Sequence, residues 1–308
     1  MIKAIFQLII FMTLIHSSYA QTENSVSSKT NYIDSIQNAK QITDLLLTID
    51  SSYKEFKLKD KLQFRDKKCQ KLSDSLKVLP WTKADFDNNG LTDILVVGKW
   101  YDHSVLCILD KQGKYEIKRI TRRSFQDCTF PIVEKHAITY YYEGEPESGK
   151  WNVPRKLIKI TLIYKFGDFI EENQTPSNHK IEKIEYATTG CYGTCPIFKL
   201  SINSDKTAKW DAVEYNDIDK QEWKGKFQTV IAQDKFEELT NLLNYIDFET
   251  LKDRYAVNWT DDQSSILTIT YDNGKVKSIS DYGLIGTFGL DRIYQLLFEL
   301  RENQKWTK

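Results

Sequence analysis

The sequence predicts an α+β protein, with a mainly antiparallel β domain in its N-terminal half and a C-terminal antiparallel sheet covered by two helices. Short β-rich runs separated by turn signals dominate residues 93–167. Apolar residues at three- and four-residue spacing mark helices at about 233–246 and from Thr287 onward. Asn273-Gly274 is a strong hairpin signal between two further β-rich runs. Together these patterns favour α+β packing.

The first twenty residues have the pattern of a secretory signal peptide. Lys3 precedes an apolar run that ends at Ile15, and small residues lie at the two positions that a signal peptidase reads before cleavage after Ala20. The run is short for a membrane span, and no later stretch is apolar over the roughly eighteen residues that a span needs. We therefore expect residues 1–20 to be removed, a polar tether over 21–34 to follow, and a secreted or periplasmic mature chain without a transmembrane segment.

The charge balance argues against two classes of partner. The 43 Lys and Arg residues equal the 43 Asp and Glu residues, and loss of Lys3 with the signal peptide would leave one acid in excess. Nucleic acids and anionic membranes both require a basic surface, so neither partner is expected. The one notable basic cluster is IKRITRR at 117–123, which we interpret as a solvated strand face and loop.

Residues 35–175 are predicted to form a helix followed by a β domain. Apolar side chains recur at helical spacing over 35–50, with Asp34 or Ser35 available as the N-cap. The strands are expected at 93–100, 104–110, 115–120, 137–144 and 156–167. The polar stretch at 172–180 is interpreted as the boundary between two domains.

Residues 179–305 are predicted to form the second domain. Its β-rich runs lie at 181–189, 197–205, 207–215, 222–230 and 265–283, the last of them the Asn273-Gly274 hairpin. The two helices bury apolar residues on one side, and the last one buries Leu290, Ile293, Leu297 and Leu300.

The stretch ADFDNNGLTDILVVG, residues 84–98, has the pattern of a calcium loop. Oxygen ligands would come from positions 1, 3, 5 and 9, with a main-chain carbonyl at position 7: Asp85, Asp87, Asn89, Asp93 and Leu91. Gly90 falls at position 6, where the chain must turn sharply. An EF-hand would have a glutamate at position 12, but this chain has Val96, and a strand rather than a helix is predicted there.

This stretch resembles the calcium loops of FG-GAP and VCBS repeats, in which an Asp- and Asn-rich loop runs straight into a strand of a β-propeller blade. The resemblance implies a calcium-binding, blade-like β unit. The chain carries one copy of the loop, which favours a single divergent unit over a complete propeller. The alternative is an Asx-rich turn that fixes its own backbone by side-chain hydrogen bonds and binds no ion.

Cys191 and Cys195 lie four residues apart in TGCYGTCPIF. An extended chain would hold their Cα atoms about 13 Å apart, but Gly190 and Gly193 let the chain fold back, and an oxidising compartment then favours a disulfide. A ring of this size contributes only about 2 kcal/mol. A redox-active pair is the alternative, and a zinc site lacks ligands because residues 180–308 contain no histidine and no other cysteine.

Cys69, Cys107 and Cys128 are the remaining cysteines. Cys107 lies in the apolar run VLCIL and is expected in the core, whereas Cys69 and Cys128 are candidates for a second pair.

Residues 179–305 resemble an uncharacterised family of exported bacterial domains, a domain of unknown function, through GCYGTCPIFKLSI and FETLKDRYAVNWTDD followed by a hairpin and a final helix. The resemblance implies one compact domain and no particular reaction.

No catalytic arrangement stands out in the sequence. His103, His136 and His179 have no metal-site spacing, and the chain lacks a phosphate loop and a nucleophile elbow. About half of the aromatic residues are expected in the core, since alternation along a strand puts Tyr140 and Tyr142 on one face and Tyr141 on the other. A stacking surface is the alternative for this set, which comprises Trp81, Trp100, Tyr101, Tyr140, Tyr141, Tyr142 and Trp151. We therefore expect a non-enzymatic binding or structural protein with a protein or glycan ligand. The alternatives are a thiol-disulfide protein that uses Cys191 and Cys195, and a hydrolase whose site the sequence does not reveal.

Overall fold

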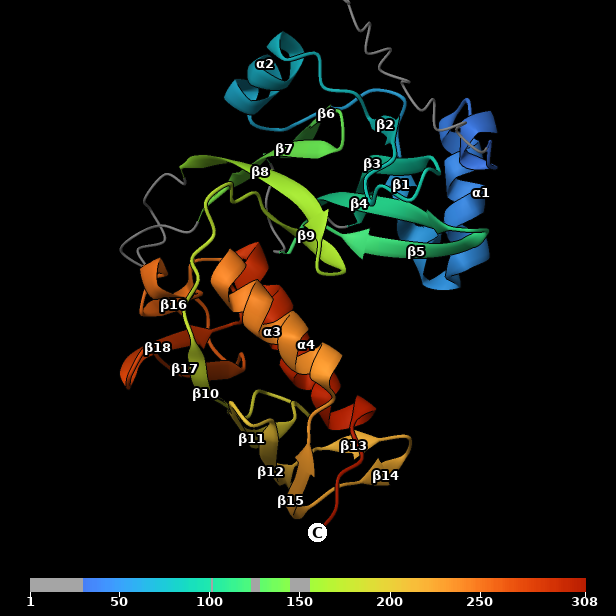
Figure 1. Ribbon diagram of the computed structural model, residues 1–308. Helices are drawn as coiled ribbons and strands as arrows, with labels where there is room; N and C mark the ends of the chain where they lie inside the picture. The colour runs from blue at the N-terminus through green and yellow to red at the C-terminus, as the bar shows by residue number, and fades with distance from the viewer. Residues whose placement is uncertain (1–29, 101, 123–127, 145–155) are drawn as a thin grey trace, which may run out of the picture.

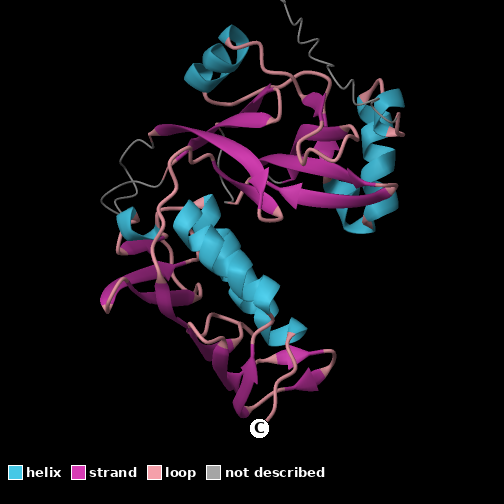
Figure 2. Ribbon diagram, in the orientation of Figure 1, coloured by secondary structure: helices cyan, strands magenta, loops and turns pink. Residues whose placement is uncertain are grey.

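The computed structural model describes residues 30–100, 102–122, 128–144 and 156–308 (Figure 1). The predicted signal peptide and most of the predicted tether lie outside these residues, as do Tyr101, Arg123 and Trp151. The predicted α+β class is confirmed, because mostly antiparallel sheets are combined with α-helices (Figure 2). In the described part of the chain, no helix is both long and apolar enough to cross a membrane.

The first sheet is an antiparallel meander with one additional edge strand. Its members are β1 (Lys57–Leu58), β2 (Trp81–Ala84), β3 (Asp93–Trp100), β4 (Asp102–Lys111) and β5 (Lys114–Arg119). Both β1 and β2 pair with the same edge of β3, at successive positions along it. Helix α1 (Ala39–Ile49) and the 3₁₀ turns η1 (Ile33–Ser35) and η2 (Ser51–Glu55) accompany this sheet. The buried side of α1 shares a core with β3 and β4 residues such as Ile94 and Leu106.

The second sheet is a four-stranded antiparallel meander. It contains β6 (Thr129–Glu134), β7 (Ala137–Glu143), β8 (Leu157–Lys165) and β9 (Asp168–Glu171). A turn at Phe166 and Gly167, both with positive φ, separates β8 from β9, so the strand predicted over 156–167 ends at Lys165. The two sheets share a second core, which joins side chains such as Leu95 and Cys107 to Phe130 and Leu162. Helix α2 (Lys67–Ser75) lies beside this unit (Figure 1).

The C-terminal half contains a seven-stranded sheet in the order β15-β12-β11-β10-β17-β18-β16. Its strands are β10 (Ile181–Thr188), β11 (Ile197–Asn203), β12 (Thr207–Glu214), β15 (Gly225–Val230), β16 (Arg254–Ala256), β17 (Ser264–Tyr271) and β18 (Lys275–Tyr282). The small hairpin β13 (Asp217–Ile218) and β14 (Gln221–Glu222) is separate, and η3 (Phe248–Thr250) follows α3.

Two helices cover one face of this sheet, as predicted (Figure 1). They are α3 (Gln233–Tyr245) and α4 (Phe288–Asn303). Their buried leucines and the inward side chains of the strands form the largest core, in which Trp210 is fully buried. The Thr287 hydroxyl accepts a hydrogen bond from the Leu290 N–H and caps α4, which confirms the predicted start of this helix.

The N-terminal end of α4 joins the two halves of the chain. The two carboxylate oxygens of Glu171, at the end of β9, accept hydrogen bonds from the N–H groups of Phe288 and Gly289 at 2.7 and 2.8 Å. A carboxylate satisfies helix N-terminal donors and interacts favourably with the helix dipole. The Phe288 side chain lies in the core of the N-terminal sheets, and Ile170 lies in the core of the C-terminal half. Each core therefore contains a side chain from the other half of the chain.

The predicted cap of the first helix was wrong. Asn38, not Asp34 or Ser35, caps α1, because its side chain accepts the Gln41 N–H at 3.1 Å. The chain is extended at Ile36, which is buried, so the helix cannot begin until after this residue. Several elements were also missed, among them α2, β1, β2, β6, β9 and β16.

Candidate functional site

The acidic loop connects β2 to β3 and brings its carboxylates together. Oxygen atoms from Asp85, Asp87 and Asp93 lie within 4.8 Å of one another. Asp85 accepts hydrogen bonds from the N–H groups of Asn89 and Gly90 at 3.1 and 2.9 Å, and these bonds hold the loop in a tight turn around its carboxylate. Gly90 has a φ of 83°, in the region that favours glycine. Sequence alone predicted this convergence, since alternate positions of a tight loop face one centre.

Asp93 is the first residue of β3 and is fully buried. Its two carboxylate oxygens each accept a main-chain N–H at 2.8 Å, one from Phe86 and one from Asp110. The pKa of Asp93 is raised to about 7, chiefly by burial and also by the charges of Asp87 and Asp85, whereas the two N–H donors oppose the rise. Negative charge is therefore costly at this point in the absence of a compensating cation.

The remaining predicted ligands lie in the same loop but are engaged with protein groups. The Asn89 amide donates hydrogen bonds to Asp87 at 3.1 Å and to the Asp110 carbonyl at 2.7 Å, and its oxygen accepts the Leu91 N–H at 2.8 Å. The Leu91 side chain is buried. Lys111, from the end of β4, pairs with the Asp87 carboxylate.

Two groups near the loop were not predicted from sequence. Lys111 also lies over the Tyr164 ring, with its Nζ atom 4.7 Å from the ring centroid. The His136 ring nitrogen Nδ1 contacts the Asp85 carbonyl. Both residues are distant in sequence from the acidic loop, so no local spacing could have indicated them.

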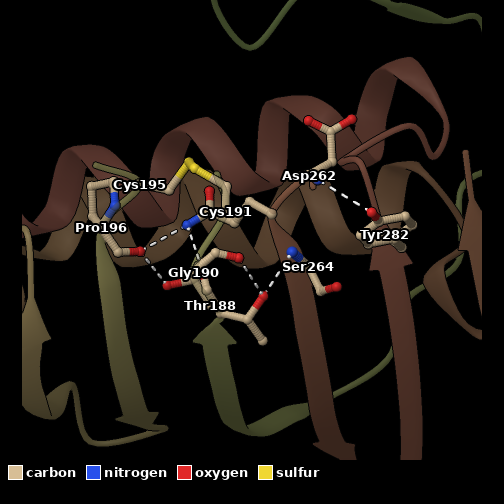
Figure 3. Close-up of a disulfide and its surroundings, with 10 residues drawn as sticks. Thr188, Gly190, Cys191, Cys195, Pro196, Asp262, Ser264 and Tyr282 are labelled. Carbon is tan, nitrogen blue, oxygen red and sulfur yellow. Dashed lines mark hydrogen bonds between the residues drawn. A yellow bond between two sulfur atoms is a disulfide. The ribbon is translucent and has the colours of Figure 1, made fainter. Parts of the chain in front are cut away.

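Cys191 and Cys195 form a disulfide with a Cα–Cα distance of 5.7 Å (Figure 3). The bonded loop joins β10 to β11 at one end of the seven-stranded sheet. It is anchored on both sides, because the Thr188 hydroxyl donates to the Pro196 carbonyl at 2.7 Å and the Tyr192 N–H donates to the Asp261 carbonyl at 2.9 Å. The Tyr192 side chain is 91% exposed, which makes it the most exposed large aromatic group of the described residues. As predicted, a strand follows the pair.

Cys69 and Cys128 form a second disulfide, with a Cα–Cα distance of 5.6 Å and a sequence separation of 59. It ties α2 to the residue before β6. Cys107 is the free, fully buried thiol, in agreement with the prediction from its apolar neighbours.

The face of the seven-stranded sheet opposite the helices contains a broad hollow of about 820 Å³. Its side chains belong to adjacent strands in register. Lys226 of β15 lies opposite Asp211 of β12, which lies opposite Lys199 of β11. In the next row, Lys209 lies opposite Ser201, and Ser201 lies opposite Glu185 of β10. Thr268, Ile266 and Lys308 also line the hollow.

A second basic cluster was missed in the sequence. Lys57, Lys59, Lys61 and Arg65 line a small hollow together with Lys99 of β3. Three of these cations alternate with other residues in KLKDK, a pattern of period two that places them on one side of an extended chain. The basic cluster at 117–123, which the sequence did indicate, is engaged in contacts within the protein. Lys118 pairs with Glu116, and Arg122 donates hydrogen bonds to the carbonyls of Gly286 and Thr287.

The other residues with chemical potential are engaged in packing or local pairing. His103 stacks on Phe64, and His179 lies between the carboxylates of Asp272 and Glu249 at 2.6 and 2.9 Å. Tyr140 and Tyr142 lie on one face of β7, as strand alternation predicted; their rings stack on each other, and both contact the Phe288 ring. These rings therefore fill the junction between the two halves of the chain.

Comparison with known proteins identifies only the C-terminal half. No curated protein and no solved structure is significantly similar to this chain. Residues 182–301, from β10 into the last turns of α4, match a family model described as a domain of unknown function, DUF6438. The C-terminal half of the chain is thus similar to an uncharacterised domain family, DUF6438, which was the kind of family expected from its sequence.

Proposed function

We propose that this protein is an exported, non-enzymatic binding protein, and that it holds its ligand on the open face of the seven-stranded sheet. The proposal rests on the 820 Å³ hollow on this face. The face is open because both α-helices of the C-terminal half cover the opposite face of the sheet. Ligand sites in proteins are concave and commonly have volumes of about 300–1,000 Å³. Two disulfides support export, since such bonds persist in oxidising compartments.

The groups on the open face suit a polar ligand. Lysines alternate with acids and hydroxyls across the strands, so neighbouring rows offer hydrogen-bond donors beside acceptors. Ile266, which is 46% exposed, supplies an apolar contact within the hollow. A glycan, or an extended polar segment of a protein, has matching donors, acceptors and small apolar patches.

Two common types of catalytic side chain are missing from the described lining of this hollow. No histidine and no cysteine lie among the described residues that line the hollow. Ser201 lies opposite Glu185 and Lys209, but no hydrogen bond joins its hydroxyl to either side chain among the described contacts. Activation of a serine requires such a bond to a base. This supports a binding role over the hydrolase alternative.

Replacement of Lys199, Lys209 and Lys226 by alanine is expected to weaken ligand binding at least tenfold without changing the fold, because each side chain is exposed. Ligands would be selected with the wild-type protein on a glycan array and from a displayed peptide library, and their affinities would then be compared between the two proteins. The matched control replaces the exposed lysines Lys54, Lys68 and Lys71. Ligands that bind the triple variant and the wild type equally would contradict the proposed site.

Calcium at the acidic loop is the second part of the proposal. The residues fit the ion, because calcium–oxygen distances of about 2.3–2.6 Å allow two ligand atoms to lie up to about 5 Å apart, and the three carboxylate oxygens lie within 4.8 Å. Asp85, Asp87 and Asp93 would bind it, with Asn89 and the Leu91 carbonyl as further candidates. Bound calcium would neutralise these carboxylates and stiffen the β2–β3 connection. The antiparallel meanders, β2 to β5 within the five-stranded sheet and β6 to β9 in the four-stranded sheet, support the likeness to blade-like units.

Calcium is expected to raise the stability of the N-terminal sheets by about 1–3 kcal/mol at ten to a hundred times its dissociation constant, because an ion that binds only the folded state stabilises it by mass action. Calorimetry in millimolar calcium and in chelator measures the effect. Asp87→Ala should abolish the difference between the two conditions, whereas Asp60→Ala, an exposed acid outside the loop, should retain it. Superimposable melts of the wild type would favour the Asx turn without an ion.

The thiol-disulfide alternative has weaker support. A redox-active cysteine needs a helix N-terminus or a cation to stabilise its thiolate. Cys195 is followed by β11, and Lys199, the nearest cation in this strand, lies on the open face of the sheet. The pair is therefore proposed to hold the β10–β11 loop in shape.

A further inference from the structure

The small hollow of about 50 Å³ beside strand β3 is lined mostly by basic and polar side chains, together with Leu62, Val97 and Gly98. Five are cations, namely Lys57, Lys59, Lys61, Arg65 and Lys99. Gln63 and His103 supply further polar groups. No aspartate or glutamate lies among the described residues that line it. This hollow, called the basic pocket below, is separate from the acidic loop and from the open sheet face.

The fold holds these cations together through apolar anchors. Leu62 and Phe64 are buried, so the alternating residues of the same segment face outward. Close packing at Gly98 brings the segment against β3, because a Cβ atom there would lie only 2.4 Å from the Phe56 ring. The basic side chains are thus positioned by the core and not by mutual attraction.

The arrangement is electrostatically unfavourable without a ligand. Lys57 and Lys99 are direct partners in the antiparallel pair β1–β3. Like charges that face each other across two strands are destabilising. None of the five cations forms an ion pair with an acidic group in the described part of the chain. Asp60 lies within the same segment but does not line the pocket.

We propose that the basic pocket binds a tetrahedral oxyanion, a phosphate or sulfate group. A hollow of 50 Å³ is far smaller than ordinary ligand sites of about 300–1,000 Å³, so it accommodates one compact group and not a whole cofactor. Several cations around one group favour a multiply charged anion. Arginine and lysine donors form strong, charge-assisted hydrogen bonds to phosphate-type oxygens. The group is either a free ion or the substituent of a larger molecule, such as a sulfated glycan.

Titration calorimetry of the full mature chain tests this proposal with three probes: inorganic phosphate, inorganic sulfate and a heparin hexasaccharide. The wild type is expected to bind at least one of them, and the affinity is expected to fall as sodium chloride rises, because salt screens exposed charges. Binding of phosphate or sulfate alone identifies a free ion, and preferential binding of heparin identifies a sulfated glycan. Absence of binding to all three at low salt overturns the proposal.

The Lys57→Gln/Lys99→Gln variant locates the site. The affinity of this variant for the anion should fall by at least about tenfold, because each substitution removes a charged hydrogen bond to the anion. The control variant Lys220→Gln/Lys224→Gln removes the same charge from exposed positions of the C-terminal half and should bind like the wild type. In ligand-free buffer the first variant should melt no lower than the wild type, since it relieves repulsion. Equal loss of binding in both double variants would show attraction by overall charge and would overturn the proposal.

Discussion

Replacement of both Cys69 and Cys128 by alanine is expected to lower the free energy of unfolding by about 4 kcal/mol, and replacement of both Cys191 and Cys195 by about 2 kcal/mol. The difference follows from the sequence separations of 59 and 4, because a longer closed loop removes more conformational entropy from the unfolded chain. The long-range disulfide also holds α2, whose buried residues are Cys69 and Ser73 only. Without the bond, α2 should detach from the sheets.

Urea denaturation followed by tryptophan fluorescence measures both losses, and amide hydrogen exchange reports on α2 separately. Residues 67–75 should lose protection in the Cys69→Ala/Cys128→Ala variant and keep it in the Cys191→Ala/Cys195→Ala variant. Each double variant serves as the control for the other, since both remove one disulfide. A larger loss from the short ring would mean that local strain or packing, and not loop length, determines the contribution.

Phe288→Ala is expected to destabilise the protein by about 3–5 kcal/mol, the usual cost of removing a buried phenylalanine side chain. The Phe288 ring is 7% exposed and packs edge-on against Tyr140, with a centroid distance of 5.9 Å. The Arg122 guanidinium lies over the same ring at 3.9 Å. Because this side chain belongs to α4 but lies in the N-terminal core, its loss should also weaken the coupling between the two halves.

Scanning calorimetry should show one transition for the wild type and two for Phe288→Ala, because the two cores can then unfold at different temperatures. Phe288→Leu, which retains an apolar side chain in the core, should lose much less stability than Phe288→Ala. Val276→Ala is a surface control, since Val276 is 62% exposed. A single transition with a loss below about 1 kcal/mol in Phe288→Ala would show that Glu171 and the other junction contacts couple the halves without this ring.

Local sequence patterns predicted most of the longer strands and three of the α-helices. They also predicted the carboxylate cluster of the acidic loop and the Cys191–Cys195 disulfide. The hairpin at Asn273-Gly274 formed because consecutive positive φ values at Asp272, Asn273 and Gly274 reverse the chain. Helix α2 escaped prediction because its sequence, KKCQKLSDS, is almost wholly polar and it buries only two residues. The spacing of apolar residues reveals which side of a helix or strand is buried, so a helix without an apolar side cannot be recognised from that spacing.

By itself, the sequence determined most of the longer strands, the two C-terminal helices, the clustering of Asp85, Asp87 and Asp93, and the Cys191–Cys195 bond. These features depend on residues a few positions apart, whose spacing limits where their side chains can lie. Only the tertiary structure decided that Lys111 and His136 meet the acidic loop, and it showed that the candidate pair Cys69 and Cys128 is bonded. It likewise decided that α4 inserts Phe288 into the other core and that Lys99 faces the 57–65 segment. Such contacts join residues far apart in the chain, and they arise when whole sheets and helices pack to bury their apolar faces.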